Sequence, residues 1–486
     1  MRLFSFWQPA LLVTVFLSSC ALPQVDTSPG GTDPVTSSSE PSTEIDTSFA
    51  GPHPPDISSA TTIPTFSFLT VEQNAFVIAE VARMDLRQKI GQMTQVSADM
   101  VCKGNLYELT VPYEFDEEKL RKVFVDYQVG SILNYPTNNY LVPAEWYVFM
   151  QRLQRMALQN GDVPLLYGQD AIHGPNYVYG ATLFPQPLGL AATFNRDLAR
   201  ESAAVCAYEM KAASIPWNFS PAMDLGRSPV WPRIWESFGE DLYLNQEMGL
   251  ASLQGYQGDD LTDLGSVAAC LKHFTGYGNP ASGRDRTPAY IPERQLREYH
   301  LPQYQTAIDA GALSIMISSA EINGIPSHAN KELLTDILRG EMGFEGLVVS
   351  DWADFNKLIY THRVAADIKE ATRMAVLAGI DMCMVPVSFD FCDALYELVE
   401  EGSVPMFRID EAVSRVLAVK VAMGLYEQNN WNPVEFPLFG GTQHQALSRS
   451  AAEEAVVLLK NEELLPLSSD TRVLITGPSA NTMRSL

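Results

Sequence analysis

The chain has 486 residues, of which 46% are hydrophobic, so it can hold two or three domains around a sizeable core. Its formal net charge is −25 at pH 7. Such an acidic balance argues against a nucleic-acid partner, which needs a basic surface, and against electrostatic attraction to anionic membranes.

The N-terminus has the pattern of an export signal. Arg2 precedes a mostly apolar run from Leu3 to Leu17, which is too short to span a membrane comfortably. The sequence that follows, Leu17-Ser18-Ser19-Cys20, resembles a bacterial lipobox. The resemblance implies cleavage before Cys20 and a lipid on its thiol, so that 1–20 is a lipoprotein signal peptide. The alternative is ordinary secretion with cleavage nearby. Either way we expect an exported protein, and a lipid anchor would hold it on a bacterial membrane, facing the periplasm or the cell surface.

Residues 21–65 are rich in Ser, Thr, Pro and Asp, can bury almost nothing, and are predicted to be a disordered tether. Five cysteines follow Cys20, without any CxxC spacing that would suggest zinc. We expect buried free thiols with at most one disulfide.

From Val71 the chain alternates between short apolar runs and longer amphipathic stretches. Residues 71–95 have helical spacing, as do 195–213 and 370–379. Buried strands that alternate with helices indicate a parallel sheet, and seven units plus a degenerate first one suit a (β/α)₈ barrel over 66–426. The predicted strands are 129–135, 163–171, 217–225, 267–274, 313–320, 346–352 and 380–386.

Polar or charged residues end several of these strands. Active sites of (β/α)₈ barrels lie at the carboxyl ends of the strands, so these residues are candidates for a site. The alternative is that strands simply end where polar residues begin, but several charged ends in one chain favour a site. The residues are Asp170, Asp224, Lys272, His273, Ser319 and Asp351.

Residues 427–445 are predicted to be a linker because of their Asn, Pro and Gly content. Within 446–486, a helix (444–461, overlapping the linker) and a strand (471–480) follow. One helix and one strand cannot close a core. We therefore expect 446–486 to be the truncated start of a second domain, an α/β sandwich, and the sequence to be a fragment.

Asp351 ends a very apolar strand, where a carboxylate has no structural purpose. Charged groups hold sugar hydroxyls through directional hydrogen bonds, and Trp352 could offer an apolar face to a sugar ring. Retaining glycoside hydrolysis needs a carboxylate nucleophile and a second carboxyl group as acid/base. These residues by themselves favour a barrel hydrolase or an aldolase-like enzyme.

Seven stretches of the barrel resemble glycoside hydrolase family 3, of the β-glucosidase type, and LLKNEELLPL (458–467) resembles the start of that family's second domain. Together these segments are highly specific, and the resemblance runs from about Val71 to the end. The barrel stretches are KIGQMTQ (89–95), LYGQDAIHG (166–174), ATLFPQPLGLAATFN (181–195), WNFSPAMDLGRSPVWPRIWESFGED (217–241), CLKHFTGYG (270–278), NGIPSHAN (323–330) and GFEGLVVSDW (343–352).

The resemblance implies a role for each matching residue. Asp351 in SDW matches the family's nucleophile, and Trp352 lies beside the bound sugar. Asp170 in GQDAIHG matches a carboxylate that holds distal hydroxyls of the terminal sugar. The remaining hydroxyl-binding candidates are Arg233, Lys272 and His273, with Arg284 as a further lining residue.

Some of these residues have structural alternatives. Arg233 could form an internal salt bridge with Glu236 or Glu240, and Lys272 and His273 could be barrel-mouth residues paired with acids. Asp224 is interpreted as structural, and His173 as a residue that orients a loop.

Other positions depart from the family. TGYG (275–278) carries Tyr277 where the hexosaminidase branch has a His, so that branch is disfavoured. Ser319 stands where some relatives have an aromatic residue. The glucosidase branch draws its acid/base from the second domain, so none is assigned here. Glu321 is a candidate substitute.

We therefore expect a retaining exo-β-glucosidase that acts on β-linked gluco-oligosaccharides or aryl β-glucosides, without a cofactor or a catalytic metal. The alternatives are a β-xylosidase or another β-glycosidase of the same family, and a sugar-binding lipoprotein fragment without efficient catalysis. Loss of an acid/base costs on the order of 10²–10⁴ in rate, so the chain is expected to cleave activated aryl glycosides best.

Overall fold

The computed structural model describes residues 63–477 and 480. The predicted signal peptide, the lipid-anchor residue Cys20 and the tether up to residue 62 lie outside the described residues.

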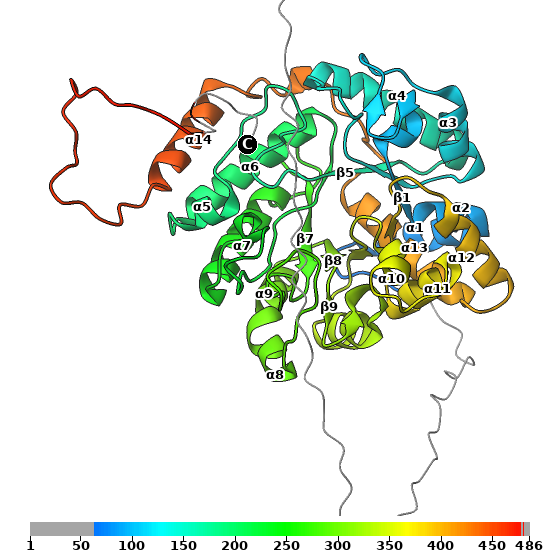
Figure 1. Cartoon of the computed structure of the whole chain (residues 1–486). Coiled ribbons are helices and arrows are strands. Elements are labelled where there is room, and N and C mark those ends of the chain that lie inside the picture. Colours follow the sequence, from blue (N-terminus) through cyan, green and yellow to red (C-terminus); the bar gives the residue numbers. More distant parts are fainter. Residues whose placement is uncertain (1–62, 478–479, 481–486) are drawn as a thin grey trace, which may run out of the picture. The chain divides into compact units, whose positions relative to one another are not determined.

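The centre of the fold is a parallel barrel (Figure 1). Its eight strands run in the order β11-β8-β7-β6-β5-β4-β1-β12, and a parallel bridge between Val349 and Met382 closes the ring between β11 and the residue before β12. The predicted (β/α)₈ fold is therefore confirmed. The strands are β1 (Thr94–Ser97), β4 (Ser131–Leu133), β5 (Leu166–Gln169), β6 (Trp217–Asn218), β7 (Ala268–Phe274), β8 (Ser314–Ile317), β11 (Leu347–Val349) and β12 (Cys383–Met384).

Helices surround this sheet and pack on its outer face (Figure 1). The predicted helices at 195–213 and 370–379 are confirmed as α6 and α11. The α-helices are α1 (Val71–Arg83), α2 (Leu86–Gln92), α3 (Glu117–Arg121), α4 (Pro143–Gly161), α5 (Pro187–Ala191), α6 (Arg196–Ala212), α7 (Leu242–Gln257), α8 (Glu293–Gln295), α9 (Pro302–Asp309), α10 (Asp354–Tyr360), α11 (Ile368–Ala378), α12 (Asp390–Glu400), α13 (Met406–Ala422) and α14 (Thr442–Glu454).

Shorter or wider helical turns and two hairpins complete the structure. The hairpins are β2 (Gly104–Asn105) with β3 (Glu108–Leu109), and β9 (Glu321–Ile322) with β10 (Ile325–Pro326). The turns are η1 (Ala98–Val101), η2 (Lys122–Asp126), η3 (Ile234–Glu236), η4 (Leu296–His300), η5 (Ser327–Ala329), η6 (Glu332–Glu341) and η7 (Pro433–Glu435).

The first barrel strand corrects the prediction of one helix over 71–95. The helix ends at Arg83, and Asp85 caps a second helix by accepting a hydrogen bond from the backbone N–H of Gln88. The chain then enters β1, whose sequence Thr-Gln-Val-Ser is too polar to read as a buried strand. All four residues are nevertheless buried, and Gln95 donates to the Ser131 hydroxyl at 2.8 Å inside the sheet.

The strands alternate between two packing layers. Leu271, Ile315 and Val348 belong to the large core between the sheet and the helices, while Cys270, Met316 and Val349 belong to a second core cluster. Side chains of a strand alternate between its faces. Cys270, Met316 and Val349 face the inside of the barrel. Residues that lie on the same strand face beyond the strand ends therefore point into the barrel mouth.

The C-terminal segment differs from its prediction. The helix expected over 444–461 ends at Glu454, and the described part of 471–480 forms no strand. A strand needs a partner for its backbone groups, and none of the described residues covers this segment, where Leu459 and Leu474 are 90% and 88% exposed. Figure 1 shows the residues after α14 as an open loop.

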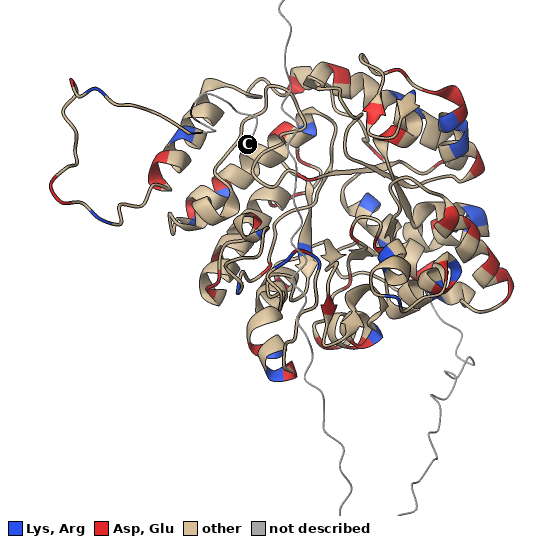
Figure 2. Ribbon diagram, viewed as in Figure 1, with Lys and Arg blue, Asp and Glu red and all other residues tan. Residues whose placement is uncertain are grey.

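The five cysteines within 63–477 are buried free thiols, as expected, and form no disulfide. Acidic and basic residues are interspersed along the helices around the barrel (Figure 2). Among the described residues, no helix combines the length and the apolar character needed to cross a bilayer.

Candidate active site

Three predicted site residues follow the inward-facing positions of their strands. Asp170 lies on the same strand face as Leu166 and Gly168 of β5. Asp351 likewise lies on the same face as Leu347 and Val349 of β11. Lys272 follows Cys270 in β7, and its ammonium donates to Asp170 Oδ1 at 2.5 Å. Lys272 is only 1% exposed, whereas the Asp170 side chain is 36% exposed. The pair therefore presents a carboxylate to the barrel mouth and holds it by a buried cation.

Hydrogen bonds hold both the backbone N–H and the carboxylate of Asp351. Its Oδ2 accepts a hydrogen bond from the Ser319 hydroxyl at 2.6 Å, and its Oδ1 accepts one from the backbone N–H of Trp352 at 2.5 Å. Its own backbone N–H donates to His328 Nε2 at 3.1 Å. Ser319 in turn accepts from Lys357 Nζ at 3.2 Å. Asp351 is thus buried, with its orientation fixed from both ends.

Asp351 is ionised despite its burial. Burial by itself raises the pKa of this carboxyl, but the positive fields of His273, Lys357, Arg233 and Arg286 outweigh it and hold the pKa well below its ordinary value. His273 contributes only when protonated, and burial together with Arg233 holds the pKa of that ring well below its usual value. The lysine and the two arginines are therefore the charges that keep Asp351 ionised at neutral pH.

A buried carboxyl orients His273. Asp224 Oδ2 lies 2.7 Å from His273 Nδ1 and also accepts the His273 backbone N–H at 3.1 Å. Burial raises the pKa of Asp224 to about 8. The low pKa of His273 leaves its ring neutral at neutral pH, so Nε2 is free for one hydrogen bond with a ligand hydroxyl. The interpretation of Asp224 as structural becomes more specific, because it positions a predicted site residue.

Arg233 forms the internal salt bridge that the sequence left open. Its Nε and Nη2 donate to the two Glu236 oxygens at 2.5 and 2.6 Å, and its Nη1 donates to the Tyr277 hydroxyl at 3.3 Å. Tyr277 donates in turn to Asp285 Oδ1 at 2.5 Å. The bidentate pair holds the guanidinium rigidly. Its field still lowers the pKa of Asp351, so the salt bridge does not remove Arg233 from the site.

One site residue was missed in the loop after β7. Arg284, the residue predicted to line the site, is exposed. Within the described part of the chain, its hydrogen bonds involve only its backbone atoms. Arg286 instead lies with Nη2 3.9 Å from Asp351 Oδ2, and it pairs with Asp285 at 2.5 Å. Two arginines separated by one residue cannot be told apart by sequence pattern. The half-buried Trp352 lies directly after Asp351 and packs on the second core cluster.

Glu321, the candidate substitute acid, lies in β9 and is paired. Its Oε2 lies 3.1 Å from His362 Nδ1, and the Glu321 side chain is 19% exposed. The Glu321 carboxylate is therefore already engaged by a histidine ring.

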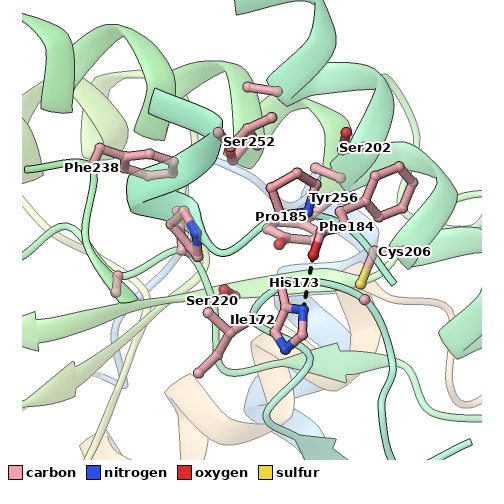
Figure 3. Close-up of a pocket in the computed structure, with 17 residues that line it drawn as sticks. Ile172, His173, Phe184, Pro185, Ser202, Cys206, Ser220, Phe238, Ser252 and Tyr256 are labelled. Atoms are coloured by element: carbon pink, nitrogen blue, oxygen red, sulfur yellow. Dashed lines mark hydrogen bonds between the residues drawn. The ribbon is translucent and has the colours of Figure 1, made fainter. Parts of the chain in front are cut away.

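The cavity in Figure 3 is lined by the loop that follows β5 and by residues of α6 and α7. His173 Nδ1 is 3.0 Å from the Phe184 carbonyl oxygen and joins the two ends of this loop, in agreement with its predicted role. The cavity has room for roughly one water molecule, and its lining includes Ser202, whose hydroxyl is buried without a partner among the described residues. It is too small for a sugar.

The fold and these contacts define a (β/α)₈ barrel protein with a charged site at the carboxyl ends of its strands, built around an ionised aspartate. The chain belongs to glycosyl hydrolase family 3, because the profile described as "Glycosyl hydrolase family 3 N terminal domain" matches residues 85–419.

Relatives agree with this assignment. The chain is 39% identical over 434 residues to a lysosomal beta glucosidase of Dictyostelium discoideum, covering 85% of the chain and 52% of the relative. It is 33% identical over 421 residues to a periplasmic beta-glucosidase of Salmonella typhimurium, covering 85% and 51%. The structure of a beta-glucosidase from Listeria innocua in complex with glucose matches with a TM-score of 0.71 and 33% identity, over 81% of this chain and 53% of that one. The chain thus spans about half the length of the relatives it matches.

Proposed function

We propose that the chain carries the catalytic barrel of a retaining exo-β-glucosidase, with Asp351 as its nucleophile. The observation that carries the proposal is a buried carboxylate that three neighbouring cations keep ionised at the end of a barrel strand. The names of the Dictyostelium, Salmonella and Listeria relatives support a β-glucosidase.

In the first step an Asp351 oxygen bonds to the anomeric carbon while the glycosidic C–O bond breaks and the leaving group takes the electron pair. In the second step water attacks the same carbon and gives its proton to a base. The bond between that carbon and Asp351 breaks as the water attacks, which regenerates the carboxylate. The low pKa of Asp351 favours both steps, because the free carboxylate is the attacking group and also the leaving group.

The remaining site residues hold the terminal sugar. Asp170, fixed by Lys272, accepts hydrogen bonds from distal hydroxyls, and the neutral His273 ring bonds another. Arg233 is held rigid by Glu236, so it loses little freedom on binding. Trp352 offers a ring face beside the anomeric carbon. Substrates are β-linked gluco-oligosaccharides or aryl β-glucosides, and no cofactor takes part.

The test is hydrolysis of 2,4-dinitrophenyl β-D-glucoside by the chain and by Asp351→Asn. Dinitrophenolate leaves without a proton, so this substrate reports the nucleophile independently of the acid/base. We expect a loss of about 10³-fold or more in kcat, because an amide cannot attack. The control Asp197→Asn replaces an exposed carboxylate (79% exposed side chain) on α6 and should keep the full rate. Equal rates for Asp351→Asn and the parent chain would refute the proposal.

The same assay with the matching β-xyloside separates the rival substrate. A glucosidase uses Asp170 to hold the 6-hydroxyl, which xylose lacks, so we expect the glucoside to be preferred. A preference for the xyloside would favour the β-xylosidase alternative. Saturable sugar binding without turnover of either substrate would favour the non-catalytic sugar-binding protein.

We also propose that the protein is exported and lipid-anchored through Cys20. The lipobox-like sequence supports the anchor, and the name of the periplasmic Salmonella relative supports export. Radiolabelled palmitate should enter the bacterially expressed protein and be absent from Cys20→Ser. Equal labelling of both would exclude the anchor.

A further inference from the structure

The contacts around Asp351 form a closed ring that begins at its backbone N–H and ends at its carboxylate. The N–H bonds His328 Nε2 at 3.1 Å, and His328 Nδ1 lies 3.3 Å from Asp354 Oδ2. The other Asp354 oxygen pairs with Lys357, which donates to Ser319 at 3.2 Å. Ser319 donates to Asp351 Oδ2 at 2.6 Å.

The ring requires one tautomer of His328. A backbone N–H can only donate, so Nε2 must carry a lone pair, and the proton of the neutral ring must sit on Nδ1. Asp354 faces that nitrogen, although Oδ2 lacks a well-aligned hydrogen bond, so its negative charge favours the proton at Nδ1. If His328 were protonated on both nitrogens, its Nε2–H group would face the backbone N–H of Asp351, and neither group could accept a hydrogen bond. Burial lowers the pKa of His328, in agreement with the neutral form.

We propose that His328 and Ser319 are positioning residues that hold the nucleophile from its two ends, His328 through the backbone of Asp351 and Ser319 through its carboxylate. The inference rests on the proposed function of Asp351. His328 comes from η5 and Ser319 from the end of β8, whereas Asp351 follows β11. The ring therefore fixes the β11 end against its neighbouring strand.

Two substitutions separate the roles of the two ring nitrogens. In His328→Gln the amide oxygen reaches the place of Nε2 and can accept the Asp351 N–H. In His328→Asn the shorter side chain places its amide near Nδ1 and leaves that N–H without an acceptor. At the other end, Ser319→Thr keeps the hydroxyl and Ser319→Ala removes it. The control is His300→Asn, since His300 is as buried as His328 (3% exposed each) and lies in η4, without a contact to Asp351.

The measurement is inactivation of the chain by 2-deoxy-2-fluoro-β-D-glucosyl fluoride. In this reaction an Asp351 oxygen bonds to the anomeric carbon and fluoride leaves, so no acid is needed. The concentration dependence gives a binding constant and a first-order rate constant. Misplacement of a reacting group by about 1 Å can cost on the order of 10²-fold. We expect His328→Asn and Ser319→Ala to lower the rate constant about tenfold or more with little change in the binding constant. His328→Gln, Ser319→Thr and His300→Asn should stay within about threefold.

Thermal unfolding of each variant accompanies the kinetics, and Ser319→Ala keeps the test open if a His328 variant does not fold. Wild-type rate constants for folded His328→Asn and Ser319→Ala would overturn the inference, as would a loss in His328→Gln equal to that in His328→Asn. If the parent chain itself is not labelled at Asp351, the proposed function fails instead, which distinguishes the two failures.

Discussion

The surroundings of Asp351 explain how a buried carboxylate can remain ionised. Desolvation disfavours its charge, and three cations restore it. Each of these cations is itself held by a carboxylate: Lys357 by Asp354, Arg233 by Glu236, and Arg286 by Asp285. Charge and geometry are therefore supplied together, which is the preorganisation that a nucleophile needs.

At this scale the family resemblance supplied most of the candidate residues. The resemblance named Asp351, Asp170, Lys272 and His273, which lie at the ends of β11, β5 and β7, alternate strands of the barrel. In the structure Asp170 pairs with Lys272, His273 with Asp224, and Asp351 with Ser319. The resemblance missed Arg286, because an arginine at either of two loop positions fits the pattern equally well. It also missed His328, whose contact with Asp351 depends on a turn that sequence does not locate in space.

Arg286 and Arg284 offer a direct comparison. Arg286→Gln removes a positive charge 3.9 Å from Asp351 Oδ2. We expect kcat/KM for 2,4-dinitrophenyl β-D-glucoside to fall about tenfold, well within the ~4 kcal/mol that such a pair could contribute at an effective dielectric constant of about 20. Arg284→Gln should have a smaller effect, because its side chain is exposed. Equal losses in the two variants would contradict the assignment of Arg286 to the site.

Among the elements, α13 joins the barrel through a buried lysine. Lys420 donates to Gln92 Oε1 at 2.6 Å and to the Gly130 carbonyl oxygen at 2.9 Å, so it links this helix to the segments that precede β1 and β4. Both partners are uncharged. Burial lowers the pKa of Lys420 from its ordinary 10.5 to about 7.

This lysine predicts a pH dependence of stability. Between about pH 7 and pH 10 the unfolded chain binds a proton that the folded chain has released, so the free energy of unfolding rises with pH, by up to about 1.4 kcal/mol per pH unit from this group. In Lys420→Met, this contribution to the rise of the free energy of unfolding with pH should be absent. Urea unfolding from pH 6 to pH 9.5 should therefore show a stability difference between parent and variant that grows with pH.

The control for this pH series is Lys460→Met, since Lys460 is exposed (78% of its side chain). Its stability difference from the parent should stay flat over the same range. A flat difference for Lys420→Met as well would contradict the low pKa of Lys420.

Prediction of elements succeeded where hydrophobic pattern and burial coincide. Strands β4 to β12 of the barrel lie within their predicted ranges, because each is an apolar run bounded by helices. They are shorter than predicted, since the runs continue into loops. The prediction missed β1, because its buried polar residues form hydrogen bonds inside the sheet. Such bonds are a tertiary effect that the local sequence pattern cannot show.

For the whole molecule, the family and the barrel could be predicted because many short motifs agree over 335 matched residues, 85–419. The C-terminal segment could not, because its secondary structure depends on contacts that the described residues do not supply. The acid/base could not be assigned from the sequence for the same reason. Glu321, the candidate among the described residues, is already paired with His362.

The proposed mechanism depends on a covalent bond between Asp351 and the sugar. The measurement is to incubate the chain with 2-deoxy-2-fluoro-β-D-glucosyl fluoride, digest it, and map the modified peptide by mass spectrometry. We expect one fluoroglucosyl group on the peptide that carries Asp351, and none in Asp351→Asn. A label on another residue, or no label on a chain shown to be folded, would contradict the proposed mechanism.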